Sequence, residues 1–241
     1  MRYCITILFV CLFSGFISSQ EKITFVAEDG LLVTADLYKI DAKKPYVLLF
    51  HQAGFSRGEY KEAIPKILKF GYNCLAVDLR SGGEVNYIQN HTALLATEKG
   101  FPIDYLSSQK DILAAIKWVS EQTRKPVILF GSSFSASLCL ILAENNPNVK
   151  AVIAFSPGEF FVDQVVVKDK LAELKKPVFV ASSKRENPYV TDLLSLSPST
   201  NKMIFAPSDG AGEHGSKSLW KSNPTNNEYW FALTMFFSKI K

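Results

Sequence analysis

The chain has 241 residues, of which 47% are hydrophobic and 21% are charged, and its formal net charge at pH 7 is +4. This length suffices for one sizeable hydrophobic core, and the composition is that of an ordinary globular protein. The Lys and Arg residues are dispersed and form no basic stripe along the chain, so we expect no nucleic-acid partner.

Residues 1–19 differ from the rest of the chain and have the layout of a secretory signal peptide. Arg2 gives a positive start, residues 5–17 are almost continuously apolar, and small residues end the segment at Ser19. The apolar run is too short to span a bilayer comfortably. We therefore expect cleavage after Ser19, with an uncleaved anchor as the alternative, and a single secreted or periplasmic domain over 22–241. After cleavage, we expect no stable membrane insertion.

Four cysteines are present, of which Cys4 and Cys11 belong to the predicted signal peptide. Cys74 and Cys139 remain, each among apolar neighbours. Exported cysteines can form a disulfide, but the apolar surroundings favour two buried free thiols that act as small hydrophobic residues. Their spacing resembles no zinc site, and we expect no bound metal.

The predicted domain begins with a hairpin, because two strand-like runs within 22–40 flank Glu28-Asp-Gly30 and Asp-Gly favours a tight turn. Beyond it, short continuous apolar runs alternate with segments of helical period. We predict the segment 81–104, which is rich in Gly and Asn, to be irregular. The strands are expected at 46–50, 74–77, 127–130, 149–155, 177–180 and 202–206, and the helices at 63–70, 107–119, 136–143, 171–174 and 229–240.

Strands that are apolar throughout are buried on both faces, and their alternation with helices indicates a mainly parallel sheet. The sequence therefore predicts an α/β fold with about eight strands, helices on both faces and the N-terminal antiparallel hairpin at one edge. In such sheets, ligands bind outside the carboxyl ends of the strands. The residues that follow each strand are therefore the candidates for chemistry.

A serine in a tight turn follows the strand predicted at 127–130. The run Gly131-Ser-Ser-Phe-Ser135 leads directly into a helix and matches the nucleophile elbow G-x-S-x-G, with Ser135 in place of the last glycine. Small flanking residues are needed because the strand and the helix pack closely at such a turn. Ser133 is therefore the candidate nucleophile, and the helix N-terminus supplies N–H groups for developing negative charge. A helix N-cap is the alternative role for Ser132, Ser133 or Ser135.

A serine nucleophile needs a base, and the chain has three histidines. His214 lies in the Gly-rich run 209–215 after the last predicted strand, where a loop can carry an imidazole over the sheet edge. His51 directly follows a strand, and His91 lies in the irregular segment, where we interpret it as a solvated loop residue. His214 is therefore the candidate base.

The order of elements, the elbow and the late histidine resemble the α/β-hydrolase family over about residues 22–240, and most closely its small dienelactone-hydrolase-like members. The resemblance implies a three-layer α/β-hydrolase fold and a triad in the order Ser, acid, His. The acid of the family follows the strand before the last. The only carboxylate in that loop is Glu186, which the resemblance therefore makes the acid.

This acid loop departs from the family pattern, because the family more often has Asp there, after a glycine. Glu is an accepted variant in such triads. The alternative role for Glu186 is that of a surface carboxylate beside Lys184 or Arg185. Asp163 and Glu159 are the rival acids, and we interpret Asp209, which is close to His214 in sequence, as a turn residue.

The resemblance extends to the loop His51-Gln-Ala-Gly54, which corresponds to the family's oxyanion motif with Gln52 in place of glycine. It implies that the backbone N–H groups of Ala53 and Phe134 bind the oxyanion, and that His51 is a structural residue that fixes this loop. Asp78 and Arg80 are similar to a structural turn of the family, in which they hydrogen-bond loops at the sheet edge. The aromatic residues of the segment 84–106 are either a wall of the substrate pocket or core packing.

These observations predict a secreted serine hydrolase that cleaves carboxylic esters with Ser133, His214 and Glu186 through an acyl-enzyme. The expected partner is a small-molecule ester or acyl substrate, and no organic cofactor or metal is needed. A peptidase or thioesterase with the same three residues is the first alternative. A non-catalytic binding protein with the same fold is the second. The sequence assigns no oligomeric state.

Overall fold

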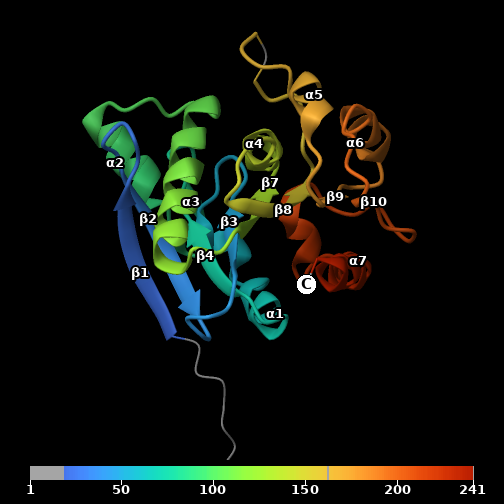
Figure 1. Cartoon of the computed structure of the whole chain (residues 1–241), viewed down its shortest axis with the longest axis horizontal. Helices are drawn as coiled ribbons and strands as arrows, with labels where there is room; N and C mark the ends of the chain where they lie inside the picture. The colour runs from blue at the N-terminus through green and yellow to red at the C-terminus, as the bar shows by residue number, and fades with distance from the viewer. Residues whose placement is uncertain (1–18, 162, 241) are drawn as a thin grey trace, which may run out of the picture.

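The computed structural model describes residues 19–161 and 163–240, so the predicted signal peptide lies outside the described residues except for Ser19. Its centre is an eight-stranded sheet with the strand order β1-β2-β4-β3-β7-β8-β9-β10 (Figure 1). The pairs β1–β2 and β2–β4 are antiparallel, and all pairs from β4 to β10 are parallel. The predicted mostly parallel sheet with an N-terminal hairpin is confirmed. The strands are β1 Ser19–Val26, β2 Leu32–Lys39, β3 Tyr46–Phe50, β4 Asn73–Val77, β7 Val127–Ser132, β8 Val149–Phe155, β9 Val178–Ala181 and β10 Lys202–Phe205.

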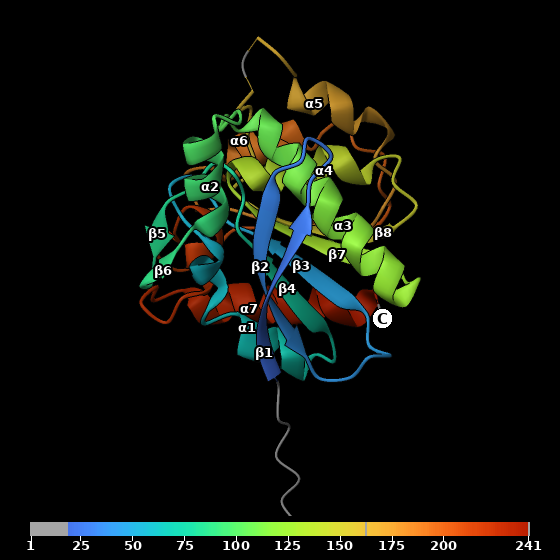
Figure 2. The same ribbon diagram turned by 90° about the vertical axis from the view of Figure 1, so that its left-hand side faces the viewer.

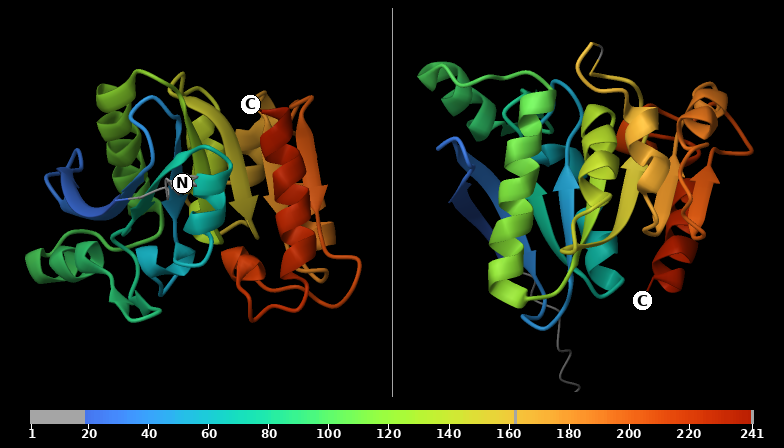
Figure 3. Two further views of the ribbon diagram at one scale, coloured as in Figure 1. Left: turned by 90° about the horizontal axis from the view of Figure 1, so that it is seen from below. Right: turned by 45° about the horizontal axis from the view of Figure 1, so that its top comes forward.

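Helices cover both faces of this sheet, as Figure 3 shows with α3 and α4 in front of it and α7 behind it. Within the described part of the chain, no helix is long and apolar enough to cross a membrane. The α-helices are α1 Ile64–Lys69, α2 His91–Lys99, α3 Gln109–Thr123, α4 Phe134–Ala143, α5 Val167–Lys170, α6 Asn187–Leu193 and α7 Asn226–Lys239; the short 3-10 helices are η1 Arg57–Tyr60, η2 Leu106–Ser108, η3 Leu171–Glu173 and η4 Gly215–Leu219.

The sheet separates two hydrophobic cores, which explains the continuous apolar runs of its strands. In β3, Leu48 and Phe50 pack into the core under α3 and α4, whereas Val47 and Leu49 pack into the core under α1 and α7. Successive side chains of a strand point to opposite faces, so every position of a central strand is buried. The three-layer arrangement predicted from the sequence therefore follows from this patterning.

Cys74 in β4 and Cys139 in α4 are both buried and free. They belong to the two different cores, and burial raises the pKa of each thiol. This agrees with the expectation of two free thiols packed as small hydrophobic residues.

The prediction that 81–104 is irregular is wrong. The segment contains a small hairpin, β5 Glu84–Val85 and β6 Ile88–Gln89, followed by α2, and Figure 2 shows both at one side of the molecule. The hairpin turn has two residues with positive φ, Asn86 at 53° and Tyr87 at 62°, where glycine is the usual sequence signal. Helix α2 begins at the N-cap Asn90, whose side chain accepts from the N–H of Ala93, and ends at Gly100 with φ 72°.

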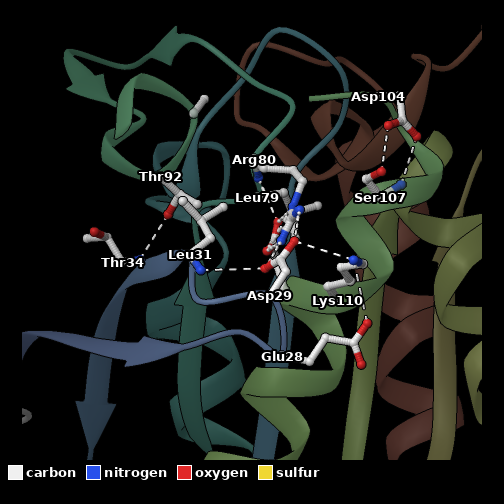
Figure 4. Close-up of polar contacts among 12 residues, drawn as sticks. Glu28, Asp29, Leu31, Thr34, Leu79, Arg80, Thr92, Asp104, Ser107 and Lys110 are labelled. Carbon is white, nitrogen blue, oxygen red and sulfur yellow. Dashed lines mark hydrogen bonds and ion pairs between the residues drawn. The ribbon is translucent and has the colours of Figure 1, made fainter. Parts of the chain in front are cut away.

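Arg80 ties the N-terminal hairpin to the rest of the fold (Figure 4). Its guanidinium is buried and lies 2.7 Å from the carboxylate of Asp29 in the hairpin turn and 2.8 Å from that of Asp111 in α3. The hydrogen bond from Arg80 lowers the pKa of Asp29 to about 2. In the same loop after β4, Asp78 pairs with Arg57 at 2.6 Å. These contacts agree with the structural roles expected for Asp78 and Arg80.

Candidate active site

Ser133 lies in a strained turn between β7 and α4. Its backbone has φ 60° and ψ −124°, a region that non-glycine residues seldom adopt and that costs free energy unless the surroundings enforce it. The turn is tight because β7 and α4 touch there: a Cβ added at Gly131 would lie 2.5 Å from the backbone of Ala136. The small residue at position 131 is therefore required by packing.

Ser135, which stands where the elbow pattern has glycine, is buried and stabilises the turn with its hydroxyl. The Ser135 hydroxyl accepts from the N–H of Ser132 at 2.9 Å and donates to the carbonyl of Phe50, the last residue of β3, at 2.8 Å. The departure from the pattern is thus compensated locally, because the hydroxyl connects the elbow to the neighbouring strand.

The structure brings Ser133, His214 and Glu186 into one chain of hydrogen bonds. The Nε2 atom of His214 lies 2.9 Å from Oγ of Ser133, and its Nδ1 atom lies 2.6 Å from Oε1 of Glu186. Ser133 is almost buried, at 6% exposure, whereas 43% of the His214 side chain is exposed. The arrangement allows a proton to pass from the hydroxyl to an imidazole whose opposite nitrogen faces a carboxylate.

Glu186 lies between β9 and α6, and its second oxygen is also satisfied. This oxygen accepts from the Ser156 hydroxyl at 2.8 Å and from the N–H of Ser183 at 3.1 Å. Burial would raise the pKa of Glu186, but the hydrogen bonds from His214 and Ser156 outweigh it and lower the pKa to about 2. The carboxylate is therefore ionised at neutral pH.

The other acids considered from the sequence lie elsewhere. Glu159 accepts from the N–H groups of Val167 and Lys168, at 2.6 and 2.8 Å, and so binds the start of α5. Asp163 is exposed in the loop before α5, and Asp209 is exposed in a turn where its N–H donates to Glu228. Among the described residues, only the Glu186 carboxylate contacts the imidazole of His214.

Ala53 and Phe134, the expected oxyanion donors, both have unengaged backbone N–H groups: neither donates a hydrogen bond to another described residue. Hydrogen bonds to its carbonyl fix the orientation of the peptide group that carries the Ala53 N–H. Its carbonyl, that of Gln52, accepts from Nδ1 of His51 at 2.9 Å and from the N–H of Phe55 at 3.2 Å. Because the N–H and C=O of a trans peptide point in opposite directions, these bonds direct the Ala53 N–H away from the loop interior.

His51 is fully buried, with both ring nitrogens engaged. Nε2 accepts from the N–H of Leu79 at 2.8 Å, so Nδ1 carries the proton that is donated to Gln52. Burial lowers the pKa of His51, which keeps the ring neutral. This agrees with the structural role expected for His51. His91 is exposed at the first position of α2, not in an irregular loop.

A mostly parallel sheet with a strained serine between a strand and a helix defines an α/β-hydrolase. The chain belongs to the dienelactone hydrolase family, whose model matches residues 30–197. It is accordingly a hydrolase of the class that acts on ester bonds.

Solved structures with the same fold include esterases and dienelactone hydrolases. The esterase Pf2001 of Pyrococcus furiosus is 18% identical with a TM-score of 0.68, over 92% of this chain and 93% of that chain. The dienelactone hydrolase of Anabaena variabilis is 14% identical with a TM-score of 0.70, over 92% and 98%. The dienelactone hydrolase-like promiscuous phosphotriesterase P91 from metagenomic libraries is 17% identical with a TM-score of 0.65, over 92% and 98%. At these identities the likeness concerns the fold. No curated protein matches the sequence.

Sequence reasoning did not identify several polar residues that support this site. Ser156 binds Glu186 and also accepts from the N–H of Gly215, the residue after the histidine. Its position directly after β8, at the edge of the sheet where ligands bind, was an available signal. Glu59 lies in η1, in the connection after β3, but the residues around it match no motif of the site.

Proposed function

We propose that this hydrolase is a secreted serine esterase in which Ser133 is the nucleophile, His214 the general base and Glu186 the acid that orients the imidazole. One observation carries the catalytic part of the proposal: the unbroken contacts Ser133–His214 and His214–Glu186, at 2.9 and 2.6 Å. Such a chain supplies what a serine hydroxyl lacks on its own, an adjacent base held in one orientation.

In the proposed reaction, Nε2 of His214 takes the proton from Ser133 as the hydroxyl oxygen attacks the carbonyl carbon of an ester. The carbonyl oxygen becomes negative and accepts hydrogen bonds from the N–H groups of Ala53 and Phe134. Cleavage of the C–O bond then releases the alcohol, which takes its proton from His214, and leaves an acyl group on Ser133. Water attacks this acyl-enzyme with the same base, releases the acid and restores the serine.

The exposure of His214 supports esters with small or surface-displayed acyl groups, because the imidazole meets solvent directly. A wall on one side is provided by Tyr105, which stacks on Phe134 with ring centroids 4.5 Å apart. We therefore expect faster turnover of p-nitrophenyl acetate and butyrate than of the palmitate ester. Faster turnover of the palmitate ester would contradict the open site.

A fluorophosphonate probe tests the nucleophile. The probe should label the wild-type protein and should fail to label Ser133→Ala, which should also lose hydrolysis of p-nitrophenyl acetate. Ser195→Ala serves as the control, since it removes an exposed hydroxyl that makes no hydrogen bond with other described residues, and it should be labelled like the wild type. A folded wild-type protein that takes up no probe contradicts the proposed function.

Export rests on the sequence of residues 1–19 and is tested separately. Expression of the full chain in a bacterium, followed by N-terminal sequencing of the exported protein, should give a chain that begins at Gln20. A protein that retains Arg2 and fractionates with membranes would instead support the uncleaved anchor.

A further inference from the structure

Glu59 is a buried carboxylate beside the proposed active site. The residue lies in η1 and its exposure is 0%. Within residues 19–161 and 163–240, no Lys, Arg or His side chain forms an ion pair with it. A buried and unpaired carboxylate is costly for a fold unless hydrogen bonds satisfy it.

Three uncharged donors satisfy the Glu59 carboxylate. Oε2 accepts from the backbone N–H of Gln52 at 2.7 Å. Oε1 accepts from the hydroxyls of Ser132 at 2.7 Å and Ser216 at 2.6 Å. Burial raises the pKa of Glu59 above its ordinary value, and the hydrogen bonds from Ser216, Ser132 and Gln52 offset this rise only in part. In the ionised form, the two carboxylate oxygens can accept all three of these hydrogen bonds.

Each donor belongs to a different loop of the site. Gln52 is adjacent to Ala53, Ser132 is adjacent to Ser133, and Ser216 is two residues from His214. The expected oxyanion donor, the nucleophile and the base are therefore each connected, within one or two residues, to a single carboxylate.

The three loops are pressed together at this point. A Cβ added at Gly215 would lie 2.5 Å from Oγ of Ser132 and 2.6 Å from Oε1 of Gln52. The N–H of Ser216 also donates to Oγ of Ser132 at 2.9 Å, and the carbonyl of Glu59 accepts from Nε1 of Trp220 at 2.9 Å. Loss of the carboxylate would therefore remove a hydrogen bond from each of the three loops.

Glu59 is also near His214, because Ser216, which bonds Oε1 of Glu59 at 2.6 Å, is two residues from the histidine. Among the other charges around the two groups, Arg57 pairs with both Asp36 and Asp78, which leaves one negative charge over, and Lys217 pairs with Glu213. His51 is neutral, Glu84 is exposed on β5, and Glu186 bonds the imidazole directly. A negative charge at Glu59 therefore favours the imidazolium that forms when His214 accepts the serine proton.

We propose that Glu59 is a positioning residue of this site: its carboxylate aligns the Ala53, Ser133 and His214 loops and adds a second negative charge that stabilises the protonated His214. The inference deepens the proposed esterase function and rests on it. It differs from the role of Glu186, because Glu59 bonds neither the imidazole of His214 nor the hydroxyl of Ser133.

The test is Glu59→Gln in the exported protein, measured as hydrolysis of p-nitrophenyl acetate over pH 5 to 9. The amide keeps the size of the side chain but loses the charge. Its NH2 group replaces one of the two acceptor oxygens, so that a donor faces either the Gln52 N–H or the serine hydroxyls. We expect kcat to fall about 10- to 100-fold with KM changed less than about threefold. We also expect the acid limb of the kcat/KM profile to move to lower pH, since the imidazolium loses a favourable charge.

Two further variants control the experiment. Glu98→Gln removes an exposed carboxylate of α2 that makes no hydrogen bond or ion pair with other described residues, and it should match the wild type. Ser216→Ala removes only the hydroxyl that links Glu59 to the histidine loop. It should lower kcat about threefold to tenfold, and it tests the inference even when Glu59→Gln does not fold.

The outcomes separate the two proposals. A wild-type protein that hydrolyses no ester overturns the esterase function itself. If the wild type is active and folded Glu59→Gln has the same rate and pH profile, only the role of Glu59 is overturned. If Glu59→Gln cannot be prepared, a Ser216→Ala protein with wild-type kcat overturns that role instead.

Discussion

Two buried carboxylates, Asp111 and Glu59, are accommodated in opposite ways. Asp111 bonds the guanidinium and the backbone N–H of Arg80, which also pairs with Asp29. Glu59 is bound by uncharged donors alone. The first cluster joins the N-terminal hairpin to α3, and the second joins the loops of the proposed active site. Paired charge is thus found where the hairpin is connected to the fold, and the unpaired carboxylate lies beside the histidine that we propose accepts a proton.

The largest effect is expected at Glu186, the carboxylate that contacts the imidazole. Glu186→Gln should lower kcat about a thousandfold or more, because the amide no longer stabilises the imidazolium and can favour the wrong tautomer of His214. Stopped-flow or steady-state hydrolysis of p-nitrophenyl acetate measures this. Asp163→Asn is the matched control and should retain the wild-type rate; the reverse pattern would make Asp163 the acid.

The next effect concerns stability and the other cluster. Arg80→Met should lower the free energy of unfolding by about 3–5 kcal/mol, because it leaves the buried Asp111 without its cation. Urea unfolding followed by tryptophan fluorescence measures this loss. The protein that remains folded should hydrolyse ester at the wild-type rate, since, among the described residues, the Arg80 guanidinium bonds only Asp29 and Asp111. A large loss of kcat with unchanged stability would break the distinction between the two clusters.

Much of this site was accessible from the sequence because its residues follow strands. Ser133 follows β7, and Glu186 and His214 lie in the loops after β9 and β10. Parallel strands place their carboxyl ends at one edge, so three residues far apart in the chain were expected to meet there. The fold could be predicted for a related reason: strands that are apolar at every position are buried on both faces and therefore lie in the centre of a sheet.

The rest was hidden because it depends on contacts without a local pattern. Glu59 bonds Ser132, 73 positions away, and Ser216, 157 positions away, and no spacing in the sequence signals such pairs. The hairpin at Asn86 and Tyr87 was missed because its turn contains no glycine. In both places, tertiary contacts outweigh local propensity; the amide of Asn86, for example, donates to the carbonyl of Gly58 in η1.

The smallest effect expected is the pH dependence of stability. Two carboxylates contribute to it: Glu186 of the proposed site and Asp29 of the N-terminal hairpin turn. The pKa of Glu186 is about 2 in the folded protein against an ordinary value of 4.5, and that of Asp29 is about 2 against 3.8. A carboxyl that is more acidic when folded stabilises the protein above its unfolded pKa, and this contribution is lost as pH falls toward 2. The free energy of unfolding should therefore decline between about pH 4.5 and pH 2.

The share of each group can be measured by urea unfolding at several pH values in this window. Glu186→Gln should remove about 1 kcal/mol of the decline, a value reduced from the full shift because the side chain is partly exposed. Asp29→Asn should also flatten the curve, whereas Glu98→Gln should leave it unchanged. A curve for Glu186→Gln with the wild-type slope would mean that the Glu186–His214 contact contributes nothing to the fold, and that the hydrogen bond serves only the reaction.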